Sequence, residues 1–154
     1  MILYLGTSSL IQLYADEPDS EAIRGWVRAA EIVATCRIAY TEVMAAVDLR
    51  FRKGHLTEDD YNLVSQRFSE DWERIVKVDF DDYEAGRFVK QYGLTRFGAL
   101  HLSAAKLLVQ EYDRQRAERE GIGALYNGSL FFLSVDEKLC KAAASEGLRI
   151  LPSH

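Results

Sequence analysis

The chain of 154 residues has the length of one ordinary domain, and its 24 acidic and 19 basic side chains give a formal net charge of −5. Hydrophobic residues make up 48% of the chain, and with only 2 prolines this composition excludes a disordered or collagen-like protein. The acidic balance argues against a protein that binds nucleic acid mainly through its net charge. We therefore expect a single globular domain over residues 1–154.

The cysteines and the N-terminus indicate a cytoplasmic protein. Cys36 and Cys140 lie far apart without the paired spacing of a zinc site, and we predict that both are reduced and buried. The first residues lack a basic segment followed by a long apolar run, and no apolar run approaches the ~18 residues of a membrane span. We expect no contact with a membrane.

Short apolar runs alternate with helical patterns along the chain. In chain order, the sequence predicts a strand at 2–5, helices from 7 and from 19, a strand at 32–35, helices over 38–53 and 57–72, a strand at 75–78, a helix over 82–92, a long helix from about 97, and finally a strand at 130–133, a helix over 136–146 and a strand at 148–151. Five short strands separated by helices predict a parallel α/β sheet with right-handed crossovers.

Local signals mark several ends of these elements. Thr57, followed three residues later by Asp60, resembles a capping box, and Gly93 stands where a helix is expected to stop. The charged stretch over 111–120 predicts a solvated helix end or a mobile extension, and residues 121–128 predict a loop.

In a parallel sheet, a functional site is expected beyond the carboxyl ends of the strands, near a topological switch point. Residues 6–8, Glu42, the start of the helix from 97 and residues 134–136 all follow or approach such ends. The sequence therefore directs attention to these four segments.

Four segments in this order resemble the successive blocks of a PIN domain of the VapC type: MILYLGTSSLIQLYADEPDSEAI, YTEVMAA, GLTRFGALHLSAA, and FLSVDEKLCKAA followed by EGLRIL. The resemblance spans nearly the whole chain. It implies a three-layer α/β/α fold with a central parallel five-stranded sheet, and the activity of a Mg²⁺- or Mn²⁺-dependent endoribonuclease, the toxin of a type II toxin–antitoxin pair. It also implies an RNA substrate, a cognate antitoxin that lays a segment into a groove, and a homodimer.

The family holds its metal with four carboxylates, and two of them are missing here. Glu42 and Asp136 match the pattern, as catalytic residues and metal ligands, whereas Gly6 and Gly98 stand where the family has aspartate. Mg²⁺ prefers hard oxygen ligands, so the loss of two carboxylates predicts weak or absent metal binding and slow or absent RNA cleavage. The alternative is an inactive PIN-like module that binds RNA or a protein. The glycines are either natural or introduced into an active toxin.

Local patterns alone give simpler interpretations of the same positions. Asp136 would cap a helix, Glu42 would be an acid in a first helical turn, and Gly98 would cost up to about 1 kcal/mol inside a helix. His101 lies one helical turn after Gly98 and could approach the site, although a neutral packed histidine is the favoured interpretation.

Further residues flank the predicted site. Thr7, Ser8 and Ser134 could orient water or phosphate there, although helix capping is the favoured interpretation of all three. Arg37 and Arg96 are predicted contacts to RNA phosphates, with a solvated surface as the default.

Overall fold

The computed structural model describes residues 1–120 and 129–153. Its strands are β1 (Ile2–Leu5), β2 (Ile32–Cys36), β3 (Val76–Val78), β4 (Leu130–Leu133) and β5 (Arg149–Ile150). They form one sheet in the order β3-β2-β1-β4-β5, and every neighbouring pair is parallel. The predicted parallel five-stranded α/β fold is confirmed, with β1 at its centre.

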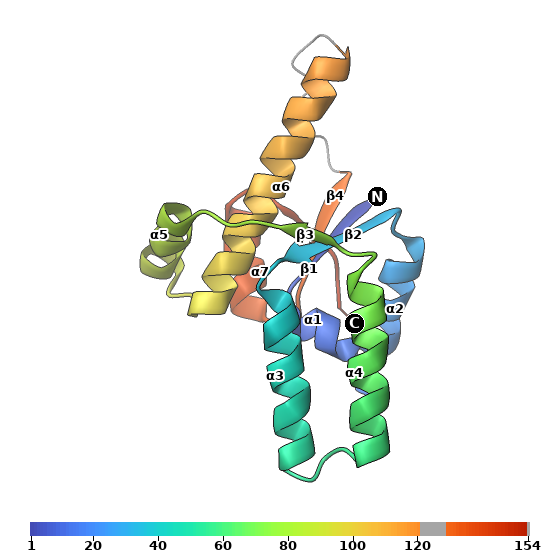
Figure 1. The fold of residues 1–154 in the computed structure, drawn as a ribbon. Helices are drawn as coiled ribbons and strands as arrows, with labels where there is room; N and C mark the ends of the chain where they lie inside the picture. Colours follow the sequence, from blue (N-terminus) through green and yellow to red (C-terminus); the bar gives the residue numbers. More distant parts are fainter. Residues whose placement is uncertain (121–128, 154) are drawn as a thin grey trace.

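Seven helices are found among the described residues, and they cover both faces of the sheet (Figure 1). They are α1 (Thr7–Gln12), α2 (Ser20–Ala29), α3 (Ala39–Arg52), α4 (Glu58–Trp72), α5 (Asp82–Tyr92), α6 (Arg96–Glu120) and α7 (Glu137–Ser145). One hydrophobic core lies between the sheet and α1 to α4, and a second lies between the sheet and α5 to α7.

The central strand supplies both cores because successive side chains point to opposite faces. Leu3 and Leu5 pack in the core under α1 to α4, whereas Ile2 and Tyr4 pack in the other. All four are buried, which explains why the segment reads as a continuous apolar run. The same alternation aims the Tyr4 hydroxyl toward α6, which matters for the site.

Helix ends agree with most of the local signals. Thr57 caps α4, accepting a hydrogen bond from Asp60 N at 3.1 Å, and Gly93 ends α5 in the left-handed conformation, with φ of 63°. The stretch 111–120 is the continuous end of α6, which agrees with the predicted helix end. The loop predicted at 121–128 lies outside the described residues.

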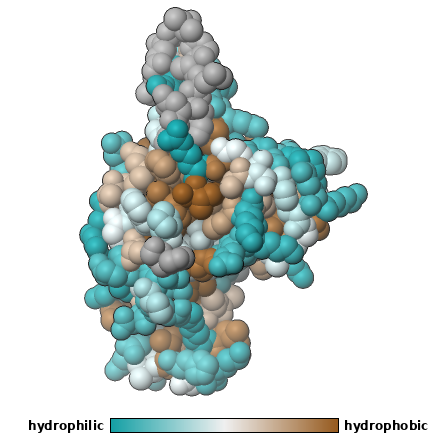
Figure 2. Space-filling model, turned by 180° about the vertical axis from the view of Figure 1, so that it is seen from behind, coloured by the Kyte–Doolittle hydropathy of each residue, from teal (hydrophilic) through white to brown (hydrophobic). Residues whose placement is uncertain are grey.

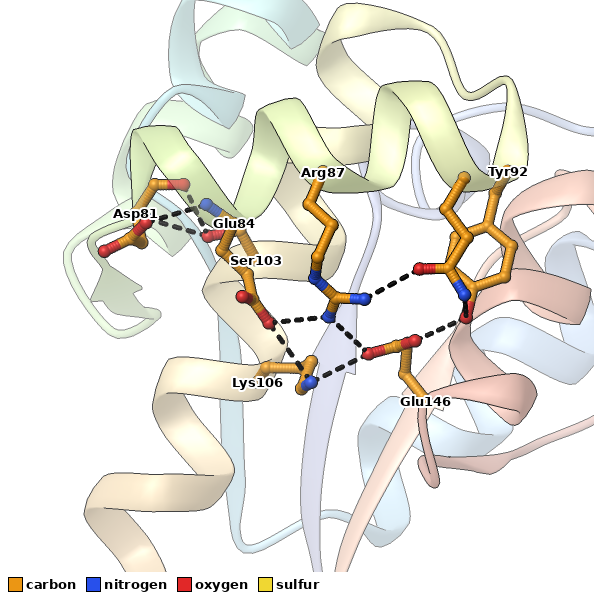
Figure 3. Close-up of polar contacts among 8 residues, drawn as sticks. Asp81, Glu84, Arg87, Tyr92, Ser103, Lys106 and Glu146 are labelled. Carbon is orange, nitrogen blue, oxygen red and sulfur yellow. Dashed lines mark hydrogen bonds and ion pairs between the residues drawn. The ribbon is translucent and has the colours of Figure 1, made fainter.

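A cluster of charged side chains joins α5, α6 and the end of α7 (Figure 3). Glu146 accepts from Lys106 at 2.8 Å and from Arg87 at 2.9 Å, and both cations also pair with Glu84. Tyr92 donates a short hydrogen bond to the same carboxylate. Burial alone would raise the pKa of Glu146, but these donors outweigh it and lower the pKa to about 2. The cluster therefore stays charged across ordinary pH.

Two parts extend from the body of the fold in Figure 1: the hairpin of α3 and α4 on one side, and the last turns of α6 on the other. From behind, the surface is mostly hydrophilic, with hydrophobic residues gathered in the middle, below the end of α6 (Figure 2). In the parts of the chain that the structure describes, no helix is both long and apolar enough to cross a membrane.

Candidate active site

The candidate site lies where the strand order reverses. From β1 the chain proceeds to β2 and β3 on one side, and β4 then pairs on the other side of β1. Gly6 follows β1 directly, and its backbone N–H donates to Leu133 O at 3.1 Å. A Cβ at Gly6 would lie 3.5 Å from Ser134 Oγ, which is ordinary van der Waals contact. The position of the missing first aspartate therefore has room for a side chain.

Four polar side chains from β1, α1, α3 and α6 form a hydrogen-bonded network beside Gly6. The Thr7 hydroxyl donates to Glu42 Oε1 at 2.8 Å and lies 2.7 Å from His101 Nε2. The same Nε2 is 3.2 Å from Glu42 Oε1, and His101 Nδ1 is 2.8 Å from the Tyr4 hydroxyl. Burial raises the pKa of Tyr4 well above its usual value, so the phenol keeps its proton.

The network is largely closed to water. The side chains of His101 and Glu42 are only 3% and 13% exposed, and Tyr4 is fully buried. Tyr4 meets the His101 ring edge-to-face at 5.9 Å and stacks on Phe132 at 5.5 Å, which fixes the orientation of the phenol. The prediction of a packed histidine is correct for burial, but it missed the bond to Glu42.

Thr7 does not cap α1, contrary to the sequence prediction. The N-cap is Gly6, whose extended backbone (φ −73°, ψ 163°) leaves no side chain to accept a bond, and Ser8 does not take that position either. Thr7 is instead the first helical residue, and its hydroxyl turns toward Glu42 and His101. The Thr7 hydroxyl therefore joins α1 to α3 and α6 and does not cap its own helix.

Asp136 and Gly98 lie at the N-terminal ends of α7 and α6. Asp136 is the N-cap of α7, and its Oδ1 accepts from Leu139 N at 3.1 Å, as the local pattern suggested. Ser134 acts locally as well, since its Oγ accepts from Asp136 N at 3.1 Å. Gly98 is the third residue of α6 and donates its N–H to Thr95 Oγ1 at 3.2 Å. The helix predicted from about residue 97 begins at Arg96, so Gly98 lies in its first turn, and its bond to Thr95 was not predicted.

The donor set does not fit a divalent cation. Among the residues that the structure describes, no three His, Cys, Asp or Glu side chains come close enough together to hold a metal ion. Asp136 uses one oxygen for its helix cap, and Glu42 receives both of its hydrogen bonds on Oε1. The glycines at 6 and 98 supply no oxygen ligand from a side chain, so only two of the four carboxylates in the family pattern remain.

An apolar groove of about 510 Å³ opens beside Glu42. Its wall includes Phe97, whose side chain is 45% exposed although it is large and hydrophobic. Thr41, Ala45 and Ala46 of α3 contribute small side chains to the groove. The groove is lined by Thr7, Ile11, Ile38, Thr41, Glu42, Ala45, Ala46 and Phe97. Local sequence patterns do not predict this groove, because its residues come from three helices that only the fold brings together.

The predicted phosphate contacts have local partners. Arg37 follows β2, is largely exposed and forms an ion pair with Asp79 at 3.5 Å. Arg96 begins α6 and lies 6.0 Å from the centre of the Phe97 ring. Contact of either arginine with RNA stays a prediction.

Cys36 ends β2 and Cys140 lies on α7, and both are free thiols. Cys36 is buried as predicted, whereas Cys140 is only partly buried and donates to Ser134 O at 3.2 Å. Burial raises the pKa of both thiols, which keeps them protonated and unreactive.

No protein-family model and no curated protein matches the chain, but solved structures share its fold. PAE2754 from Pyrobaculum aerophilum is 15% identical with a TM-score of 0.59, covering 97% of this chain and 92% of its own. FitAcB from Neisseria gonorrhoeae is 15% identical with a TM-score of 0.56, covering 99% and 98%. FitAB bound to an IR36 DNA fragment is 17% identical with a TM-score of 0.59, covering 100% and 96%. The chain therefore has the PIN-like fold that its sequence motifs predicted.

Proposed function

We propose that this protein is a PIN-fold component of a toxin–antitoxin type pair that has lost metal-dependent RNA cleavage and acts by binding a partner protein in the groove beside Glu42. The observation that carries the proposal is the donor set: two of the four carboxylate positions are glycine, and the described residues offer no group of three metal-binding side chains. Hydrolysis of a phosphodiester by a bound metal needs protein ligands that fix the coordination of that metal.

The groove supports a protein partner because of its shape and composition. Ala45 and Ala46 present small side chains one turn beyond Glu42, so a neighbouring backbone can approach α3 closely. Phe97 supplies an exposed aromatic surface opposite them. Such a groove suits a helix or an extended segment with apolar side chains.

The charge in the groove indicates one further property of the partner. Glu42 lines the otherwise apolar groove, and the described residues bond only to its Oε1. A mostly buried carboxylate is stabilised by any donor that reaches its other oxygen. We therefore expect the bound segment to place a lysine, an arginine or an amide group opposite Glu42.

Co-purification with the protein encoded next to this gene tests the proposal. Phe97→Asp would place a charge in the apolar wall and is expected to weaken partner binding at least tenfold in calorimetry. Val89→Asp is the matched control, since Val89 is exposed to a similar extent, 43%, but lies on α5 away from the groove. Equal affinity of wild type and Phe97→Asp would contradict the proposal. Light scattering of the free protein tests the expected homodimer.

Cleavage of RNA tests the catalytic half of the proposal. Wild type is expected to show no EDTA-sensitive cleavage in millimolar Mg²⁺ or Mn²⁺, whereas Gly6→Asp with Gly98→Asp restores the four-carboxylate pattern. Gly6 has free room, and at Gly98 only Thr95 Oγ1, 3.2 Å from an added Cβ, must shift. Cleavage only in the double variant would identify a disabled nuclease, and robust cleavage by wild type would refute the proposal.

A further inference from the structure

We infer that Glu42 acts in this chain as the acceptor of a metal-free polar clamp, formed with Tyr4, Thr7 and His101, which joins the helical layers on the two faces of the sheet. The inference rests on the proposed loss of metal binding. It does not depend on what occupies the groove.

The clamp connects helices that pack in two different hydrophobic cores. Thr7 and Glu42 come from α1 and α3, whose apolar faces pack in one core, while His101 comes from α6 in the other. Tyr4 belongs to the central strand, on the side that faces α6. Three bonds of 2.7 to 2.8 Å and one of 3.2 Å therefore run from the sheet through α6 to α1 and α3.

Counting donors and acceptors distinguishes the two single-proton tautomers of His101. When the Tyr4 hydroxyl donates to Nδ1, Nε2 carries the ring proton and points it at Thr7 Oγ1 and Glu42 Oε1. The Thr7 hydroxyl is then free to donate to Glu42 Oε1. All four contacts pair a donor with an acceptor.

The opposite tautomer fails this count. With the proton on Nδ1, the bare Nε2 would face the Glu42 carboxylate across 3.2 Å, which places two acceptors against each other. Thr7 would also have one hydrogen for two acceptors. The Glu42 carboxylate thus favours the Nε2-protonated tautomer of His101. As the terminal acceptor, it also sets which group donates in each of the other hydrogen bonds.

A clamp and a metal site predict opposite responses to the loss of this carboxylate. In a metal site without its ion, neighbouring carboxylates repel one another, so neutralising one of them stabilises the protein. In the clamp, Glu42 accepts two hydrogen bonds in a setting closed to water, so neutralising it weakens both. The sign of the stability change therefore separates the two roles.

Thermal unfolding of Glu42→Gln at neutral pH tests the inference. We expect a Tm lower than wild type by about 3–6 °C, from the weakening of charge-assisted hydrogen bonds in a domain of this size. Glu58→Gln is the control: it also removes a first-turn acid from a helix, but Glu58 is exposed. Thr7→Val should lower the Tm similarly. The double variant should lose less than the sum of the two single losses, because both substitutions break the same Thr7–Glu42 bond.

Two measurements on the wild type remain decisive even if a variant fails to fold. Nitrogen-15 spectra should show His101 as the neutral tautomer protonated at Nε2, and millimolar Mg²⁺ should leave the Tm unchanged. A Tm of Glu42→Gln equal to or above that of wild type would overturn the inference. So would an Nδ1-protonated His101, or a rise in the wild-type Tm with Mg²⁺, since a ligand that binds the folded state stabilises it.

These readouts do not involve the partner. Undiminished partner binding by Phe97→Asp, with the clamp readouts as expected, would refute the proposed partner groove alone. Weakened partner binding by Phe97→Asp, with a Tm of Glu42→Gln at or above that of wild type, would refute the clamp alone.

Discussion

Replacing Glu146 by glutamine is expected to lower the free energy of unfolding at pH 7 by about 2–3 kcal/mol. Three donors converge on this carboxylate: Lys106, Arg87 and the Tyr92 hydroxyl (Figure 3). They hold the pKa of Glu146 at about 2 in the folded protein, against 4.5 for the free side chain. Each pKa unit of that difference corresponds to about 1.4 kcal/mol. Because Arg87 is partly exposed, solvent screens its interaction with Glu146, and the expected loss is smaller than the whole pKa difference would give.

The pH dependence of this effect has a definite sign. Because folding lowers the pKa, the unfolded chain binds the proton more readily, and the stabilisation is complete above the unfolded value of about 4.5. It is lost as the pH falls from about 5 toward 2, the folded value. Wild type and Glu146→Gln should therefore differ at pH 7 and converge near pH 2.

Urea unfolding from pH 7 down to pH 2 measures both the size and the pH dependence. Glu73→Gln is the matched control, since Glu73 is the C-cap of α4 as Glu146 is the C-cap of α7, but Glu73 is exposed. We expect the control to change stability by less than ~0.5 kcal/mol at any pH. Equal stability of wild type and Glu146→Gln at pH 7, or a difference that stays constant down to pH 2, would refute the reasoning.

Two further predictions concern the glycine and aspartate positions of the site. Asp136→Ala should cost about 1 kcal/mol by removing the acceptor of Leu139 N, while Asp136→Asn retains the cap and should cost far less; equal costs in thermal unfolding would contradict the role as a cap. Gly98→Asp should be more stable than Gly98→Asn by about 0.3–1 kcal/mol, because a negative charge in the first turn interacts favourably with the helix dipole. The first turn of α6 contains no other acid. If the two variants unfold at the same denaturant concentration, that argument fails.

The central strands were predicted accurately because their signals are local. The runs 2–5 and 130–133 are apolar on both faces and end at Gly6 and Ser134, where the chain turns into the next element. The outer strands proved shorter than predicted: Val76–Val78 and Arg149–Ile150 replace 75–78 and 148–151. Ile75 and Leu148 are apolar because they are buried beside the sheet, not because they belong to its ladder.

The polar network of the site was beyond local patterns. His101 is 97 residues from Tyr4 and 59 from Glu42 in the sequence, and no spacing rule connects residues so far apart. The family motifs placed Glu42 near the site, but they gave no reason to expect an imidazole bonded to it. Thr7 was assigned to a cap by its residue type, and the structure shows a different partner because Gly6 takes the N-cap position.

A buried carboxylate needs either a cation or hydrogen-bond donors, because leaving it with neither costs several kcal/mol. With glycine at positions 6 and 98, Glu42 keeps its place in α3 without two of the acids that would help to attract a divalent ion. Thr7 and His101 supply the donors instead, and Tyr4 orients His101 for that task. The fold can therefore retain a carboxylate at the carboxyl edge of its sheet without metal, and the groove beside it stays open to a partner.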